Sequence, residues 1–175
     1  MSWLIPPMTA PAPIIVSASL DPNSFAWLDG LRRAHFPAER NVLDAHLTLF
    51  HALPPSLEPE LRRRLSSLTH GRPPAAEASG LVGLGRGVAV RIVSPQLGAL
   101  REELAEAFVG MLTPQDAAGW RAHVTIQNKV SPAETRDLLA LLSAKFRPRR
   151  VEVVGLAAWW YRGGPWEPLA RYAFR

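Results

Sequence analysis

The chain has 175 residues, 47% of them apolar, and a mean hydropathy of +0.00, which is typical of one globular domain. It contains no cysteine, so disulfides, a thiolate nucleophile and a cysteine-based zinc site are excluded. The formal charge of +5 favours an anionic partner, although 18 arginines against 2 lysines in an Ala- and Pro-rich chain are also typical of a GC-rich genome.

Neither a membrane span nor a secretory leader is predicted. A span needs roughly 18 to 20 uninterrupted apolar residues. The opening residues lack a basic segment, and their apolar run is interrupted by Pro6, Pro7, Pro11 and Pro13. We therefore expect a cytoplasmic monomer with no membrane partner. Residues 1–12 are predicted to be a flexible arm and residues 13–175 a single two-lobed domain.

The first half of the chain predicts three strands that alternate with two helices. β-branched runs and the spacing of apolar residues place these elements at residues 13–20, 25–36, 42–53, 57–68 and 76–84. The run Asp21-Pro22-Asn23-Ser24 offers an N-cap before the first helix, and Gly71-Arg72-Pro73-Pro74 ends the second.

The second half repeats this order and adds one strand. Its elements are predicted at residues 88–94, 95–111, 119–130, 131–146, 151–161 and 168–174. Gly85-Arg86-Gly87 indicates a tight hairpin, and Ser131 with Glu134 has capping-box spacing. The prediction is an α+β fold of duplicated β-α-β-α-β units, about 13–84 and 88–161, in two pseudo-symmetric lobes around a central cleft.

The two units share a motif, His-Leu-Thr-Leu at residues 46–49 and His-Val-Thr-Ile at residues 123–126, 77 residues further on. Alternate residues of a strand point to the same face, so the histidine and threonine of each motif project together. Two such pairs in a duplicated frame indicate one symmetric catalytic site. The four candidate residues are His46, Thr48, His123 and Thr125.

Paired His-x-Thr-x motifs, each on a strand before a helix, resemble the two-histidine (2H) phosphoesterase superfamily, in particular its bacterial 2′-5′ RNA ligase-like branch. The resemblance covers about residues 13–161. It implies that His46 and His123 are catalytic and that Thr48 and Thr125 contact the substrate phosphate. It also implies hydrolysis of 2′,3′-cyclic phosphodiesters to 2′-phosphates without metal or cofactor, with reversible 2′-5′ RNA ligation in some members. The implied partners are RNA with cyclic phosphate ends or small cyclic nucleotides.

Histidine suits this chemistry because water must lose a proton on one side of phosphorus while the leaving alkoxide gains one on the other. With an unperturbed pKa of about 6.5, one imidazole can be neutral while another is charged near neutral pH. Two fixed hydroxyls stabilise the negative charge that grows on the non-bridging oxygens. By resemblance His46 is the general acid and His123 the general base, but the pseudo-symmetry leaves the reverse assignment open.

Two other functions compete with this hypothesis. Metal catalysis is disfavoured because His46 and His51 point to opposite faces of a strand and no His-Glu-x-x-His motif is present, so no metal site is predicted. A non-catalytic nucleotide- or RNA-binding module would use the same cleft. The intact histidines and threonines argue against it. Aromatic residues could stack a base beside the cleft or pack in the core; they are Trp120, Trp159, Trp160 and Tyr161.

One asymmetry is visible two residues before each motif histidine, where Arg121 corresponds to Asp44. If both side chains reach the rim of the cleft, Arg121 attracts an anionic substrate on one side and Asp44 repels it on the other. Alternatively, both are solvated or pair with each other. Arg121 is therefore a candidate substrate contact.

Overall fold

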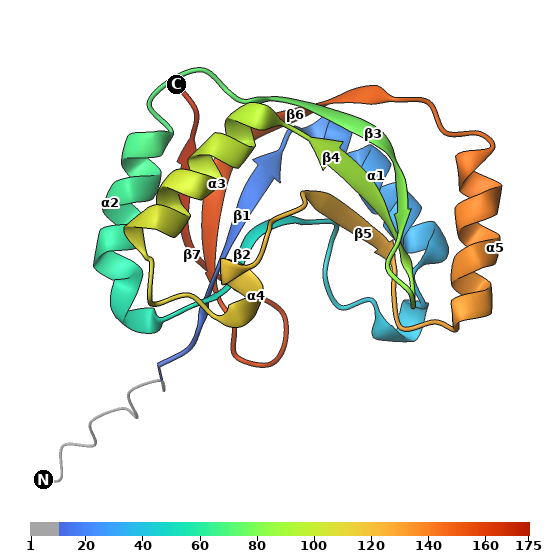
Figure 1. Ribbon diagram of the computed structural model, residues 1–175, viewed down its shortest axis with the longest axis horizontal. Coiled ribbons are helices and arrows are strands. Elements are labelled where there is room, and N and C mark those ends of the chain that lie inside the picture. Colours follow the sequence, from blue (N-terminus) through green and yellow to red (C-terminus); the bar gives the residue numbers. More distant parts are fainter. Residues whose placement is uncertain (1–10) are drawn as a thin grey trace, which may run out of the picture.

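The computed structural model describes residues 11–175 (Figure 1), so the expected arm falls outside the described residues except for Pro11 and Ala12. In chain order the strands are β1 (Ile14–Leu20), β2 (Leu47–Leu53), β3 (Ala75–Gly83), β4 (Val88–Val93), β5 (His123–Gln127), β6 (Arg149–Trp160) and β7 (Glu167–Ala173). The α-helices are α1 (Pro22–His35), α2 (Glu58–Leu68), α3 (Pro95–Ala107), α4 (Pro114–Ala117) and α5 (Pro132–Ser143), and 3-10 turns lie at η1 (Ala38–Arg40) and η2 (Pro55–Leu57).

The strands form one antiparallel sheet in the order β2-β1-β6-β3-β4-β5, with β7 paired to β6. The series β1-α1-β2-α2-β3 recurs as β4-α3-β5-α5-β6, with α4 inserted before β5. The two halves of the sheet, β2-β1-β6 and β5-β4-β3, therefore have equivalent orders. The predicted α+β fold of duplicated units in two pseudo-symmetric lobes is confirmed.

The third strand of each unit pairs in the half of the sheet that the other unit begins. Strand β6 lies beside β1, and β3 lies beside β4. Residues 149–152 of β6 also pair with β3, whereas residues 153–160 pair with β1, so β6 runs through both lobes. This exchange joins the lobes through continuous backbone hydrogen bonds, so they share a single sheet.

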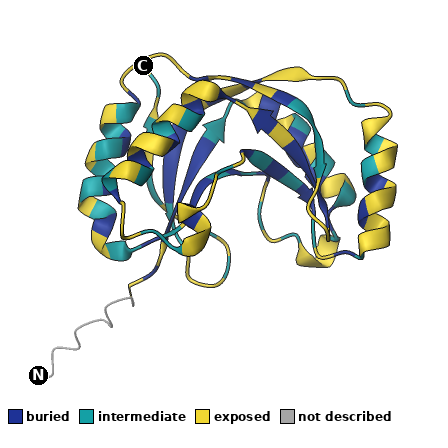
Figure 2. Cartoon of the chain, viewed as in Figure 1, coloured by how far each residue is buried: buried dark blue, intermediate teal, exposed yellow. Residues whose placement is uncertain are grey.

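The helices cover the outer faces of the two lobes. Helix α1 packs against β5 and α5 against β3 and β4, whereas α2 packs against β7. In Figure 1, α1 and α5 lie on one side of the molecule and α2 and α3 on the other, with β2 and β5 between them. Buried residues concentrate on the strands between these helix pairs (Figure 2). No helix among residues 11–175 is long and apolar enough to cross a membrane.

The core decides which way the motif side chains point. Alternate residues of the motifs are fully buried in it, namely Leu47, Leu49, Val124 and Ile126. Because strand side chains alternate between faces, the histidine and threonine of each motif must lie on the opposite face, where all four are half-buried. Burial of the apolar side chains in the core thus fixes the direction in which the histidine and threonine side chains point.

Local sequence signals explain several boundaries. The Asp21 carboxylate accepts hydrogen bonds from the backbone N–H groups of Asn23 and Ser24, which caps α1. Both hydrogen bonds of the predicted capping box join Ser131 and Glu134. A Cβ on Gly87 would overlap the backbone oxygen of Gln127, so only glycine permits this close approach of the β3–β4 turn to the end of β5.

The two motif strands are shorter than the predicted 42–53 and 119–130. β2 begins at Leu47 and β5 at His123. The backbone before β2 is held by side chains instead of a strand partner: Asp29 accepts from the Ala45 N–H at 2.9 Å, and the Arg32 Nε donates to the Leu43 carbonyl at 3.0 Å. The predicted helix at 95–111 also ends early, at Ala107, and α4 follows.

Candidate active site

The two motif strands lie at opposite ends of the sheet order but face each other at the centre of the molecule (Figure 1). Side chains from other elements join them. The Trp120 indole N–H donates to the Thr48 carbonyl at 3.0 Å, and the Arg32 guanidinium donates to the Thr125 carbonyl at 2.9 Å. The carbonyl groups of both motif threonines are therefore fixed by donors from outside their own strands.

The two histidine rings are held in the same way. The Nδ1 of His46 donates to the Asp44 carbonyl at 2.8 Å, and the Nδ1 of His123 donates to the Arg121 carbonyl at 2.8 Å. A carbonyl oxygen can only accept, so each neutral ring carries its hydrogen on Nδ1. The Nε2 atoms have no hydrogen-bond partner among residues 11–175. Each ring therefore offers a free Nε2 lone pair.

The threonine hydroxyls complete the set of polar groups. Their backbone carbonyls are bound, but no hydrogen bond of the described residues involves the hydroxyl of Thr48 or Thr125. Both side chains are half-buried. Two hydroxyls that face the same region as two histidines, and that are not engaged by the protein, are available to donate to a ligand's oxygens.

Two buried arginines, which the sequence did not single out, support the motif strands. Arg32 of α1 and Arg101 of α3 are only 4% and 5% exposed. The Arg101 guanidinium donates to the Leu49 carbonyl at 3.2 Å, so it holds β2 from the second unit as Arg32 holds β5 from the first. Burial lowers the pKa of both guanidinium groups, but arginine stays charged at neutral pH. These cations make the site favourable for an anion.

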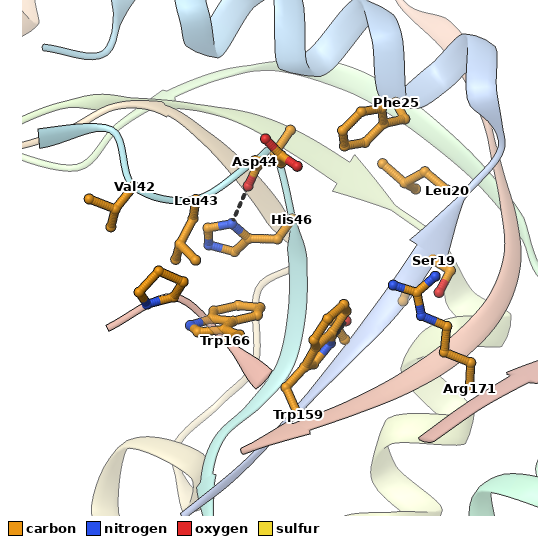
Figure 3. Close-up of a pocket in the computed structure, with 14 residues that line it drawn as sticks. Ser19, Leu20, Phe25, Val42, Leu43, Asp44, His46, Trp159, Trp166 and Arg171 are labelled. Carbon is orange, nitrogen blue, oxygen red and sulfur yellow. Dashed lines mark hydrogen bonds between the residues drawn. The ribbon is translucent and has the colours of Figure 1, made fainter. Parts of the chain in front are cut away.

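His46 has a covered side. The ring of Trp166, from the connection between β6 and β7, lies 4.6 Å from the His46 ring at 59° (Figure 3). The pKa of His46 is lowered to about 4, mainly by burial; the hydrogen bond to the Asp44 carbonyl opposes this shift, and the nearby charges of Arg32 and His123 add to it. His46 is therefore neutral at pH 7 before any ligand binds.

A family model described as the 2′-5′ RNA ligase superfamily matches residues 20–165. The chain belongs to the 2′-5′ RNA ligase superfamily. The family resemblance stated from the paired motifs, 2H phosphoesterases and their 2′-5′ RNA ligase-like branch, is thereby confirmed. A search of curated protein sequences gives no match.

Solved structures share this superfamily fold. TT0787 of Thermus thermophilus has a TM-score of 0.66 and 16% identity, covering 93% of this chain and 98% of that one. E. coli LigT complexed with 3′-AMP has a TM-score of 0.62 and 19% identity, covering 94% and 98%. A protein described as a phosphoesterase has a TM-score of 0.58 and 20% identity, covering 94% and 99%. The whole described fold is thus that of the superfamily.

The charged side chains that the sequence predicted at the rim of the site do not pair with each other. Arg121 and Asp44 are exposed, and no ion pair joins them among residues 11–175. His51 instead pairs with the buried Asp116, 3.2 Å between Nδ1 and Oδ1. No group of three His, Asp or Glu side chains in the described chain is arranged to hold a metal ion.

Proposed function

We propose that this chain hydrolyses 2′,3′-cyclic phosphodiesters of RNA ends or nucleotides to 2′-phosphates without a metal, and that the same site permits reversible 2′-5′ RNA ligation. The observation that carries the proposal is the paired geometry: two histidines of one tautomer with free Nε2 atoms, beside two unengaged threonine hydroxyls. Membership of the 2′-5′ RNA ligase superfamily supports it. So do the structures of E. coli LigT with 3′-AMP, NADP+ and phosphate, all of which carry phosphate groups.

The reaction needs two proton transfers on opposite sides of phosphorus. One neutral imidazole accepts a proton from water at Nε2 while the water oxygen attacks phosphorus. The bond from phosphorus to O3′ breaks, and the second imidazole, protonated at Nε2, gives its proton to O3′. Thr48 and Thr125 donate to the non-bridging oxygens, and the Arg32 charge favours the anionic transition state. The products are a 2′-phosphate and a free 3′-hydroxyl.

The lowered pKa of His46 favours it as the base, since the hydrogen bonds of the two histidine rings are the same. A ring with a pKa of about 4 is neutral at pH 7 and its Nε2 is bare, as a base requires. The acid role implied by the resemblance requires the bound phosphate anion to raise this pKa first. Substrate with sulfur in place of the 3′ bridging oxygen separates the roles, because a thiolate leaves without a proton. It should rescue His123→Ala and not His46→Ala; the opposite result would restore the roles that the resemblance implies.

The activity test uses a nucleoside 2′,3′-cyclic phosphate and an oligonucleotide that ends in a cyclic phosphate, both with EDTA. Turnover that persists in EDTA and disappears in His46→Ala and His123→Ala supports the proposal. His70→Ala is the matched control, since His70 is exposed and its ring makes no hydrogen bond or ion pair among the described residues. Loss of turnover in EDTA would contradict a metal-free reaction. Binding without turnover of either substrate would favour the non-catalytic binding module.

A further inference from the structure

A cavity of about 460 Å³ opens directly beside His46 (Figure 3). It is bounded by β1, by the residues that lead into β2, and by the end of β6 with the connection that follows it. Cavities that hold small ligands measure roughly 300 to 1,000 Å³. This space therefore has the size of a ligand site, and any group within it lies next to the proposed reacting phosphate.

One side of the cavity is formed by two indole rings that the protein holds in place. The ring centroids of Trp166 and Trp159 are 6.1 Å apart, with 53° between the ring planes, and Trp166 also contacts the ring of His46. The Trp159 N–H donates to the Ser17 hydroxyl at 2.9 Å, and the Arg171 guanidinium lies 5.2 Å from the ring centroid. Both indoles are half-buried. Their positions are set without a ligand, so the aromatic surface is preformed.

The other side of the cavity combines apolar and polar groups. Phe25 and Leu20 lie across from the indoles in Figure 3, and Ser19, Asp44 and Arg171 border the space. Neither Asp44 nor Arg171 forms an ion pair among residues 11–175. A flat ring with a polar edge fits such a site: its faces stack on aromatic and apolar groups, and its edge meets donors and acceptors.

We infer that this cavity binds the nucleobase of the substrate, stacked on Trp166 and Trp159, while the attached ribose presents its cyclic phosphate to His46. The inference rests on the proposed function and adds to it the residues that recognise the base of the substrate. The sequence indicated Trp159 as one of four aromatic candidates. The structure separates it from Trp120, whose indole holds the Thr48 carbonyl, and adds Trp166.

The test compares a nucleoside 2′,3′-cyclic phosphate with ribose 2,3-cyclic phosphate, which lacks a base. Base stacking on aromatic side chains is worth a factor of roughly 5 to 150 per base. We expect the KM of the baseless substrate to be higher by a factor in this range. Trp166→Ala should remove most of that preference, and Trp166→Phe, which keeps a ring, should retain part of it. Tyr161→Ala, at an exposed aromatic residue outside the cavity, is the control.

Trp166 also covers His46, so its loss changes the reaction of both substrates. Only a change in the ratio of the two KM values reports on the base. An unchanged ratio in Trp166→Ala and Trp159→Ala, with both variants folded by near-ultraviolet circular dichroism, would overturn the inference. So would equal KM values for the two substrates in the wild-type protein.

A binding measurement separates failure of this inference from failure of the proposed function. If neither cyclic phosphate is turned over, the proposed activity fails, and tryptophan fluorescence is then followed with a nucleoside 2′-monophosphate. Quenching that inorganic phosphate does not produce, and that Trp166→Ala weakens, supports the base site independently of turnover. No quenching by the nucleotide would overturn it.

Discussion

The two histidines have the same backbone geometry but different surroundings. Each donates its Nδ1–H to the carbonyl two residues earlier, at 2.8 Å in both cases. His46, however, lies against Trp166 beside a cavity, whereas no aromatic ring contacts His123 within residues 11–175. The duplicated strands thus supply the shared chemistry, and the unduplicated segment after β6 makes the two sides different. If the proposed base site is correct, that segment orients the substrate, because it supplies the Trp166 ring beside His46.

The largest expected effect tests what the two sides share. Replacing His46 or His123 with Asn removes one positioned proton transfer, and each should lower kcat by a factor of about 10² to 10⁴. The two losses should not multiply in the double variant, because both transfers belong to one step. Single-turnover rates on a nucleoside 2′,3′-cyclic phosphate measure this. A loss of less than tenfold for either histidine would show that the site does not use both.

The buried arginines should matter next, and for stability. Arg32→Met leaves the carbonyls of Leu43 and Thr125 without their charged donor, and we expect it to lower the free energy of unfolding by about 3 kcal/mol. Arg33, one residue further along α1, is 71% exposed, so Arg33→Met should cost less than about 1 kcal/mol. Urea unfolding of both variants measures the difference. Equal effects would mean that the hydrogen bonds of Arg32 to these carbonyls do not stabilise the fold.

Sequence reasoning could predict the motifs but not the hydrogen bonds by which the two buried arginines hold the motif strands. The alternation of apolar residues in 46–49 and 123–126 predicts which way the side chains point, because successive residues of a strand face opposite sides. Arg32 and Arg101 act on strands of the opposite unit, and nothing local in the sequence marks a contact across that distance. They are also not separated by the 77 residues that separate the motifs, because the segment with α4 lengthens the second unit.

Trp166 was missed for a related reason. It lies in a connection after Gly163-Gly164-Pro165, where neither strand nor helix periodicity predicts the direction of a side chain. Its position against His46 follows from how β6 and β7 pair. The paired motifs can therefore be predicted from the sequence, whereas the position of Trp166, which makes the two sides of the site different, requires the tertiary structure.

The lowered pKa of His46 should make the stability of the fold depend on pH. The pKa of His46 falls from 6.5 in the unfolded chain to about 4 in the folded one, so the unfolded chain binds the proton more readily. The stabilisation is complete above pH 6.5 and is lost as the pH falls from 6.5 to 4, by at most about 3 kcal/mol. Urea unfolding of wild type and His46→Asn across this range isolates the contribution.

Trp166→Ala should reduce this dependence, because an uncovered His46 ring keeps a pKa nearer 6.5. A nuclear magnetic resonance titration of the His46 ring protons measures the pKa directly in both proteins. If the titration of His46 is the same with and without Trp166, the covering ring is not the source of the asymmetry, and burial by the residues that precede β2 would have to account for it.

The smallest expected effect concerns the residues whose carbonyls hold the two histidines, Arg121 and Asp44. Both side chains are exposed, so substitution with alanine leaves the backbone carbonyls in place and changes only the charge at the rim. Arg121→Ala should raise the KM of a cyclic phosphate about two- to fivefold at low salt, with kcat nearly unchanged, because it removes uniform attraction of an anion. With ribose 2,3-cyclic phosphate, which has no base to reach the cavity that Asp44 borders, Asp44→Ala should lower KM by a similar factor. Both effects should fade at ionic strengths where the screening length falls to about 3 Å, near 1 M salt.

Steady-state kinetics at two salt concentrations measure the two changes in KM, and opposite signs would confirm that the rim charges favour entry of the substrate from the His123 side. If neither variant changes KM at low salt, attraction of the substrate rests on the buried Arg32 and Arg101, which are equivalent in the two units and cannot favour either side.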